Sequence, residues 1–204
     1  MTMTLYHCSG ARSTRVIWTL EEMGLDYELR TLPFPPRVLQ KDYLGINPLG
    51  TVPYFMDGKT RMTESAAICQ YLAETRGPTP LAVYAGEPDY GAFLNWLHYA
   101  DATITFPQTI VLRYSLLEPQ ERRLPQAVED YRGFFLGRLR AVEAALADGR
   151  DYLCAERFTI ADICVGYALY LARVLKIEDA FTPRIGQWWE RLSARPAFRR
   201  AAER

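Results

Sequence analysis

One segment of the chain, residues 46–55, reads INPLGTVPYF, and TESAAI follows it closely at residues 63–68. The first segment predicts a turn that leads into a short strand beginning near the Val52–Pro53 bond. Proline cannot donate a hydrogen bond to a sheet, so it belongs at the start or the edge of a strand. An X-Pro bond is also the place where a cis peptide costs least. If this bond is cis, the N–H and C=O of Val52 turn out of the sheet, where an extended peptide can pair with them.

The second segment predicts the start of a helix, with Glu64 and Ser65 at its N-terminus. A helix N-terminus attracts a carboxylate through its free N–H groups and its macrodipole, and the Ser65 hydroxyl adds a donor. The Glu64 carboxylate has the opposite charge and suits an ammonium group. Together with the backbone of Val52, these two side chains predict a receptor for a small zwitterionic peptide.

These residues resemble the glutathione-binding half of cytosolic glutathione transferases of the bacterial type, either serine-type or unclassified, and the resemblance covers the whole chain. It implies an α/β plus all-α protein. A thioredoxin-like, glutathione-binding domain with a cis-proline would span residues 1–77, and a helical bundle with a second-substrate pocket would span residues 86–204. The implied activity is attack of the glutathione thiol on a small hydrophobic electrophile, as in detoxification. Glutathione is then a co-substrate, no cofactor is expected, and a homodimer is implied.

The hydrophobic pattern agrees with this division. A strand, a helix ended by Gly24 and a second strand within about thirty residues predict a βαβ unit with a parallel pair. Asp57-Gly58 predicts a hairpin turn. Beyond a linker at residues 77–80, the pattern is helical and contains no convincing strand. The predicted elements are strands at 3–7, 26–32, 52–56 and 60–62, a short helix at 37–44, a helix from 65 to about 76, and helices from 91 to about 176.

Composition narrows the class of function. The 204 residues carry 24 basic and 24 acidic side chains, so no nucleic-acid footprint and no attraction to an anionic membrane surface are expected. The longest apolar run, residues 163–172, is much shorter than the roughly 20 residues that span a bilayer. The N-terminus does not resemble a signal peptide. Four scattered cysteines and two histidines predict no metal site and favour a reduced, cytoplasmic setting.

The catalytic group should lie between the first strand and the first helix, in residues 6–15. A free thiol has a pKa of about 8.5 and only the thiolate attacks, so the site must stabilise the thiolate. By the resemblance, Ser13 would donate a hydroxyl, with a plain helix cap as the structural alternative. Tyr6 would donate a phenol, or simply pack. Cys8 would form mixed disulfides or stay inert, although the next residue is Ser9 where such relatives have proline.

Arg12 would place a cation beside the sulfur, or be only a solvated charge. It stands where bacterial cysteine-type members have cysteine, so that class is not indicated. For the peptide, the resemblance assigns backbone pairing to Val52 in the Val52–Pro53 bond, and the γ-glutamyl end to Glu64 and Ser65. The resemblance also implies that Lys41 and Thr51 meet the glycine end of glutathione. Asp101 would reach glutathione across a dimer interface. The implied second-substrate pocket is lined by Phe34, Tyr99, Phe106 and Tyr114.

Two other functions stay open from the sequence. One is a glutathione-dependent thiol reductase or peroxidase that uses Cys8 or the glutathione thiol directly. The other is a non-catalytic glutathione-binding module of the same fold, because fold does not determine function. A last motif is structural: Thr159 and Asp162 predict a capping box at a helix start, and residues 157–162 resemble the buried capping motif of the family's helical domain.

Overall fold

The computed structural model describes residues 2–204, apart from the side chain of Asp179. Its contacts divide the chain into two compact units. The first runs up to Ala82 and also contains Ser193–Arg204, and the second is Val83–Leu192. The domains predicted from the sequence are residues 1–77 and residues 86–204. Met1, where the predicted first domain begins, lies outside the described residues.

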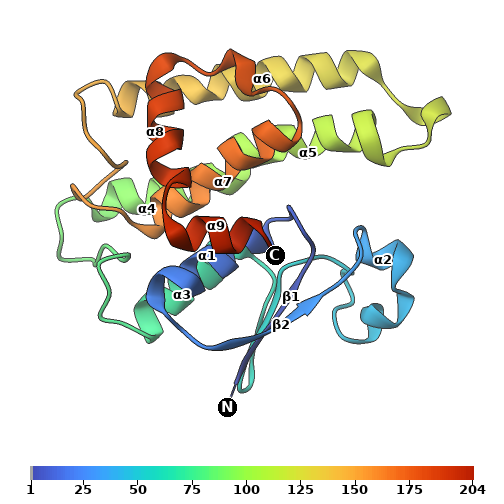
Figure 1. Ribbon diagram of the computed structural model, residues 1–204, viewed down its shortest axis with the longest axis horizontal. Helices are drawn as coiled ribbons and strands as arrows, with labels where there is room; N and C mark the ends of the chain where they lie inside the picture. The colour runs from blue at the N-terminus through green and yellow to red at the C-terminus, as the bar shows by residue number, and fades with distance from the viewer. Residues whose placement is uncertain (1) are drawn as a thin grey trace. The chain divides into compact units, whose positions relative to one another are not determined.

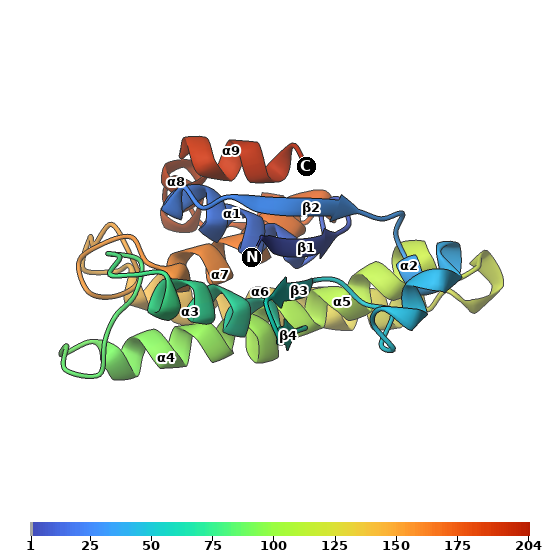
Figure 2. The same cartoon turned by 90° about the horizontal axis from the view of Figure 1, so that it is seen from below.

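The first unit contains a four-stranded mixed sheet with the order β2-β1-β3-β4, whose strands are labelled in Figure 2. Its central strand β1 pairs in parallel with β2, as the βαβ pattern predicted, and antiparallel with β3. The predicted hairpin is formed by β3 and β4. The strands are β1 (Met3–His7), β2 (Tyr27–Thr31), β3 (Tyr54–Asp57) and β4 (Thr60–Met62).

Alternation along β1 determines which side chains enter the core of this unit. Met3, Leu5 and His7 are buried, whereas Thr4 and Tyr6 on the other face are half-buried. Successive strand residues point to opposite faces, so this pattern follows from the sequence. Helices α1 (Ser13–Met23) and α3 (Ser65–Thr75) pack against each other in this unit. The N–H of Gly24, which has a φ of 61°, caps the last turn of α1.

Helix α9 (Pro196–Ala202) belongs to this unit because it packs on α1 (Figure 2). The rings of Trp18 and Phe198 lie 4.7 Å apart between their centroids. Beside them, the Arg195 guanidinium donates two hydrogen bonds to the Glu22 carboxylate, at 2.6 and 2.8 Å. A helix that follows the whole second unit in the chain therefore completes the core of the first.

The segment predicted as one short helix at 37–44 forms two separate turns. Helix α2 (Pro36–Leu39) is followed by the 3₁₀ helix η1 (Lys41–Gly45). Between them Gln40 has φ −139° and ψ 77°, which is outside the helical region. The change of direction buries Tyr43, which is 1% exposed.

The second unit is helical, and its described residues contain no strand, as the sequence predicted. Helices α5 and α6 pack side by side (Figure 1). Two stretches are π-helical: in η2, the N–H of Phe106 donates to the carbonyl of Asp101, five residues earlier. The elements are α4 (Tyr90–His98), η2 (Tyr99–Thr105), α5 (Phe106–Leu112), η3 (Arg113–Leu117), η4 (Gln120–Arg122), α6 (Pro125–Ala145), α7 (Ile160–Val174), η5 (Glu178–Ala180) and α8 (Pro183–Ser193).

The start of α7 has the capping box that the sequence predicted. The Thr159 hydroxyl accepts a hydrogen bond from the N–H of Ala161, and Asp162 Oδ2 accepts one from the N–H of Thr159 at 2.8 Å. Asp162 Oδ1 also accepts from the N–H of Leu153 at 2.9 Å. The carboxylate therefore holds both the helix start and the loop before it.

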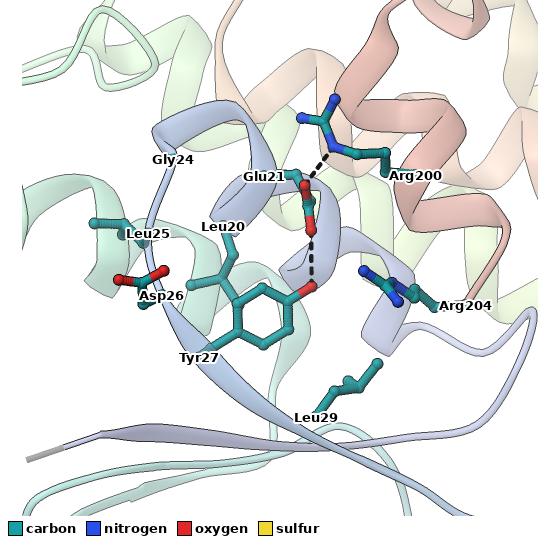
Figure 3. A pocket seen from close by; sticks show the side chains of 9 residues that line it. All are labelled: Leu20, Glu21, Gly24, Leu25, Asp26, Tyr27, Leu29, Arg200 and Arg204. Carbon is teal, nitrogen blue, oxygen red and sulfur yellow. Dashed lines mark hydrogen bonds and ion pairs between the residues drawn. The ribbon is translucent and has the colours of Figure 1, made fainter.

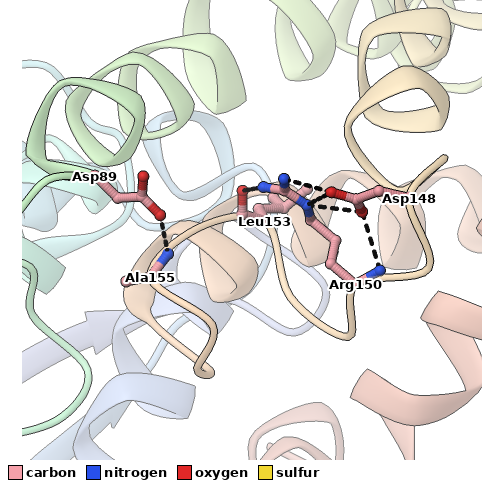
Figure 4. Close-up of polar contacts among 5 residues, drawn as sticks. All are labelled: Asp89, Asp148, Arg150, Leu153 and Ala155. Carbon is pink, nitrogen blue, oxygen red and sulfur yellow. Dashed lines mark hydrogen bonds and ion pairs between the residues drawn. The ribbon is translucent and has the colours of Figure 1, made fainter.

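Further contacts hold the same loop (Figure 4). Asp89 Oδ2 accepts from the N–H of Ala155 at 2.6 Å, and the Arg150 guanidinium pairs with Asp148 while donating to the carbonyl of Leu153. Ala155 and the next residue have positive φ values of 56° and 51°, a conformation that non-glycine residues seldom adopt. The loop between α6 and α7 is thus a defined structure.

Candidate active site

The segment that binds peptide backbone in the sequence-based prediction is Val52–Pro53, and this bond is cis. Within residues 2–204, the N–H and C=O of Val52 make no hydrogen bond. The preceding carbonyl, of Thr51, is held by two donors: the Tyr43 hydroxyl at 2.8 Å and the Asn47 amide at 2.9 Å. A fixed loop with one unpaired residue of backbone is suited to pairing with an extended peptide.

Two residues, Asn47 and Gly50, determine the backbone conformation just before this loop. Asn47 makes an Asx turn, in which its Oδ1 accepts from the N–H of Leu49 at 3.2 Å. Gly50 has φ +60°, and a Cβ placed there would lie 2.6 Å from the Cβ of Arg37. Only glycine satisfies both the backbone conformation and the close approach of α2. The run NPLG is therefore the structural support of the Val52 backbone.

The predicted carboxylate subsite lies at the N-terminus of α3. Ser65 is its first residue and Glu64 its N-cap residue, with an exposed carboxylate. The guanidinium of Arg15, fully buried on α1, donates to Ser65 Oγ at 3.0 Å. A guanidinium has no acceptor, so Ser65 Oγ accepts in this contact and keeps its own proton to donate elsewhere. This geometry is compatible with the predicted role of Ser65 toward a carboxylate.

At the first turn of α1, the Ser13 side chain is buried against the sheet. Its Oγ lies 2.8 Å from His7 Nδ1, and both residues are fully buried. Desolvation lowers the pKa of His7 to about 4, so the imidazole is neutral at neutral pH. The main-chain N–H of Ser13 makes no hydrogen bond within the described part of the chain. The Ser13 hydroxyl thus lies against His7, inside the core of the first unit.

The other catalytic candidates differ in exposure. Cys8 is fully buried, its Sγ lies 3.7 Å from the carbonyl oxygen of Pro33, and desolvation raises its pKa to about 11. It is therefore a protonated thiol at neutral pH. Tyr6 is half-buried on the other face of the sheet, where its ring lies 5.4 Å from that of Tyr43. Arg12 is half-buried at the N-cap of α1.

The remaining candidates are distributed over both units. In the first unit, Lys41 and Thr51 are exposed, and Phe34 is exposed in the loop before α2. In the second unit, the Tyr99 hydroxyl donates to the carbonyl of Arg138, and Asp101 lies in η2. Phe106 is exposed, and Tyr114 is half-buried. The assignment of these residues to substrate remains a prediction.

Several residues that build the site were not identified from the sequence. Arg15 and His7 support Ser65 and Ser13 from inside the core, and Tyr43 holds the loop before Val52. A basic residue on the apolar face of the α1 helix was the available signal for Arg15. Asn47 lies in the segment that was predicted as a turn, but the contact of its side-chain amide with the Thr51 carbonyl was not predicted.

The described residues include no group of histidine, cysteine or acidic side chains that could hold a metal ion. Among them, no helix has both the length and the apolar character needed to cross a membrane. The polar groups of the site are instead backbone amides, hydroxyls and a guanidinium.

A thioredoxin-like unit with a cis-proline loop, followed by an all-helical unit, defines the fold of the cytosolic glutathione transferases. Comparison with known proteins agrees with this class. Residues 5–80 match the family described as glutathione S-transferase, N-terminal domain, and residues 109–196 match glutathione S-transferase, C-terminal domain. The chain belongs to the glutathione S-transferase family, and it is a glutathione transferase.

Individual relatives are similar along nearly their whole length. The probable glutathione S-transferase GSTF2 of Oryza sativa subsp. japonica is 30% identical, with 93% of this chain and 90% of that protein covered. Glutathione S-transferase GstA of Escherichia coli O157:H7 is 29% identical, with 95% and 94% covered. The crystal structure of a glutathione transferase from Methylococcus capsulatus (strain Bath) has 29% identity and a TM-score of 0.87, with 99% and 98% covered.

Proposed function

We propose that this transferase binds glutathione along Val52 and at the N-terminus of α3, and that it activates the thiol at the first turn of α1. The unpaired backbone of Val52 carries the proposal, since it offers one donor and one acceptor to an extended peptide. Ser65, oriented by Arg15, would donate to the γ-glutamyl carboxylate, and the exposed Glu64 would accept from its ammonium group. Lys41 and Thr51 would meet the glycine end.

For the thiolate, two features of the first turn of α1 support stabilisation there. The free N–H of Ser13 lies at the positive end of the helix, where an anion is favoured. The Arg12 cation at the N-cap favours the thiolate in the same sense. Ser13 Oγ lies 2.8 Å from His7 Nδ1, on the side of the core, and we assign the role to the main chain of Ser13. Tyr6 remains the alternative donor.

The second substrate in this proposal is a small hydrophobic electrophile. The candidates for its apolar wall are Phe34, Tyr99, Phe106 and Tyr114, of which Phe34 and Phe106 are exposed. We further propose a homodimer that works in the cytoplasm. Exposed apolar side chains gather between residues 34 and 49, as expected of a surface that another subunit covers. The cysteines of the described chain are all free thiols, as expected of a reducing compartment.

The test is a pH titration of thiolate absorbance for glutathione bound to the wild type and to single variants. We expect a bound-thiol pKa at least about one unit below the free value of about 8.5. Arg12→Gln should raise it by roughly one unit. Ser13→Ala should leave it nearly unchanged, because the variant keeps the main-chain N–H to which we assign the role. Tyr6→Phe is the matched variant, because it removes a single hydroxyl from the other face of the sheet.

Other results would redirect the assignment. If Ser13→Ala raises the pKa by a unit or more, the hydroxyl is the donor and the main-chain assignment is wrong. If only Tyr6→Phe does so, the phenol is the donor. If the bound thiol titrates like free glutathione, the chain does not activate the thiol in this way. Cys8→Ser should retain turnover, since the pKa of the buried thiol is raised to about 11.

A further inference from the structure

A concave site lies at the opposite end of α1 from Ser13. It is a cavity of about 510 Å³ formed by the end of α1, the start of β2 and the residues at and just beyond α9, and we call it the α9 cavity (Figure 3). Helix α1 has eleven residues, so its two ends are about 16 Å apart at 1.5 Å per residue. The volume falls within the range of small-molecule sites, roughly 300–1,000 Å³.

The floor of the α9 cavity is apolar and incompletely covered. Leu25, Tyr27 and Leu29 line it, and each is half-buried rather than buried. In Figure 3 the ring of Tyr27 lies in the middle of the cavity wall. A flat apolar group placed here would remove the remaining exposed area of these side chains from water, which is favourable.

Hydrogen bonds within the wall of the cavity hold Glu21 and Arg200 in place without a ligand. Glu21 accepts from the Tyr27 hydroxyl at 3.0 Å through one oxygen and from Arg200 Nε at 2.5 Å through the other. The pKa of Tyr27 is raised to about 12 by burial and by Glu21, so the phenol remains a donor. The Glu21 charge is thereby compensated. Arg200 is held by its Nε, which leaves its terminal nitrogens without an acceptor in residues 2–204.

Two further charges stand at the two sides of the Tyr27 ring (Figure 3). The guanidinium of Arg204 makes no hydrogen bond or ion pair within the described chain. On the other side, the Asp26 carboxylate is exposed and likewise has no partner among the described groups. The α9 side of the cavity is therefore cationic, and the side toward Asp26 is anionic.

We propose that the α9 cavity binds a small aromatic carboxylate. Its anionic group would lie at the guanidinium of Arg204 and the free end of Arg200, and its flat body would cover the Tyr27 ring and the two leucines. A guanidinium matches a carboxylate with two parallel hydrogen bonds, which gives this group preference over a neutral one. The site shares no residue with the proposed glutathione site, so a ligand can occupy it while glutathione is bound.

The probe is 2-naphthoate, and its neutral isostere 2-naphthamide is the ligand control. Binding is followed by the NMR shifts of the Leu25 and Leu29 methyl groups, in full-length protein saturated with S-methylglutathione. We expect saturable shifts with naphthoate and at least about threefold weaker binding of the amide. Arg204→Gln should weaken naphthoate binding by about three- to tenfold.

Two control variants make the test specific. Arg199→Gln removes the same charge at a nearby position, in α9, that does not line the cavity, and it should change affinity by less than about twofold. Asp26→Asn removes the repelling charge and should tighten binding, by up to about threefold. The proposal is wrong if the leucine signals do not shift, if the amide binds as well as the carboxylate, or if the two arginine variants lose the same affinity. None of these outcomes depends on where glutathione binds.

Discussion

The capping carboxylate of α7 gives the sharpest prediction. At pH 8, Asp162→Ala should lower the free energy of unfolding by about 2–4 kcal/mol. The substitution leaves two buried backbone N–H groups, of Leu153 and Thr159, without their acceptors at 2.9 and 2.8 Å. Each such loss costs about 1–3 kcal/mol. Part of this cost is offset because a buried carboxylate is itself unfavourable, which is why burial raises the pKa of Asp162 to about 7.

The assay is urea unfolding followed by circular dichroism, with wild type and variants under the same conditions. Asp162→Asn should lose less than the alanine variant, because its remaining oxygen can still accept one N–H. Asp148→Ala is the matched control: it removes an exposed carboxylate of the same loop, and it should leave the unfolding midpoint within error (Figure 4). A loss below about 0.5 kcal/mol for Asp162→Ala would show that water replaces the carboxylate and would refute the reasoning.

Three further substitutions test other parts of the fold by the same urea assay. Gly50→Ala should cost about 2–4 kcal/mol, since φ is +60° and the new Cβ would lie 2.6 Å from the Cβ of Arg37; a neutral result would show that the loop shifts freely. The pKa of His7 falls from 6.5 to about 4 on folding, so the unfolded chain binds the proton first and wild-type stability falls as pH drops through this window. Between pH 6 and 5 the free energy of unfolding of the wild type should fall by about 1 kcal/mol per pH unit, and that of His7→Asn should lack this fall. If the two proteins show the same dependence on pH, the lowered pKa of His7 is wrong. Phe198→Ala should lower the free energy of unfolding by about 3 kcal/mol, because its ring packs on Trp18. Phe134→Ala, at an exposed phenylalanine, is the control and should lower it much less. Equal losses would show that α9 adds nothing to the core.

Local patterns in the sequence were sufficient for several features of the first unit and for one helix start of the second. Residues 3–7 were predicted as a strand, with the bounds that β1 has, and Gly24 marked the end of α1. The Asp57-Gly58 dipeptide gave the hairpin, and Thr159 with Asp162 gave the capping box. Each of these features is determined within a few residues, by backbone conformation or by a side chain that reaches its own helix end.

Contacts between distant residues were not predictable in this way. The amphipathic pattern of residues 196–202 does not indicate that the apolar face of this helix packs on Trp18. The contact of Arg15 with Ser65 joins residues 50 positions apart. Ser13 was predicted as a hydroxyl donor because its position at a helix start matches that of the serine in serine-type transferases. Its burial against His7 depends on how the loop between them folds back, and sequence spacing does not report this.

The return of α9 to the first unit has a consequence for synthesis of the chain. Residues 83–192 must all be translated before Ser193–Arg204 appear. At about 5–20 residues per second, this interval lasts roughly 5–20 s. Throughout it, the nascent first unit presents an uncovered tryptophan face on α1, because Phe198 has not yet been made. A ribosome-bound chaperone that recognises exposed aromatic side chains could therefore bind the nascent chain at Trp18 during this interval.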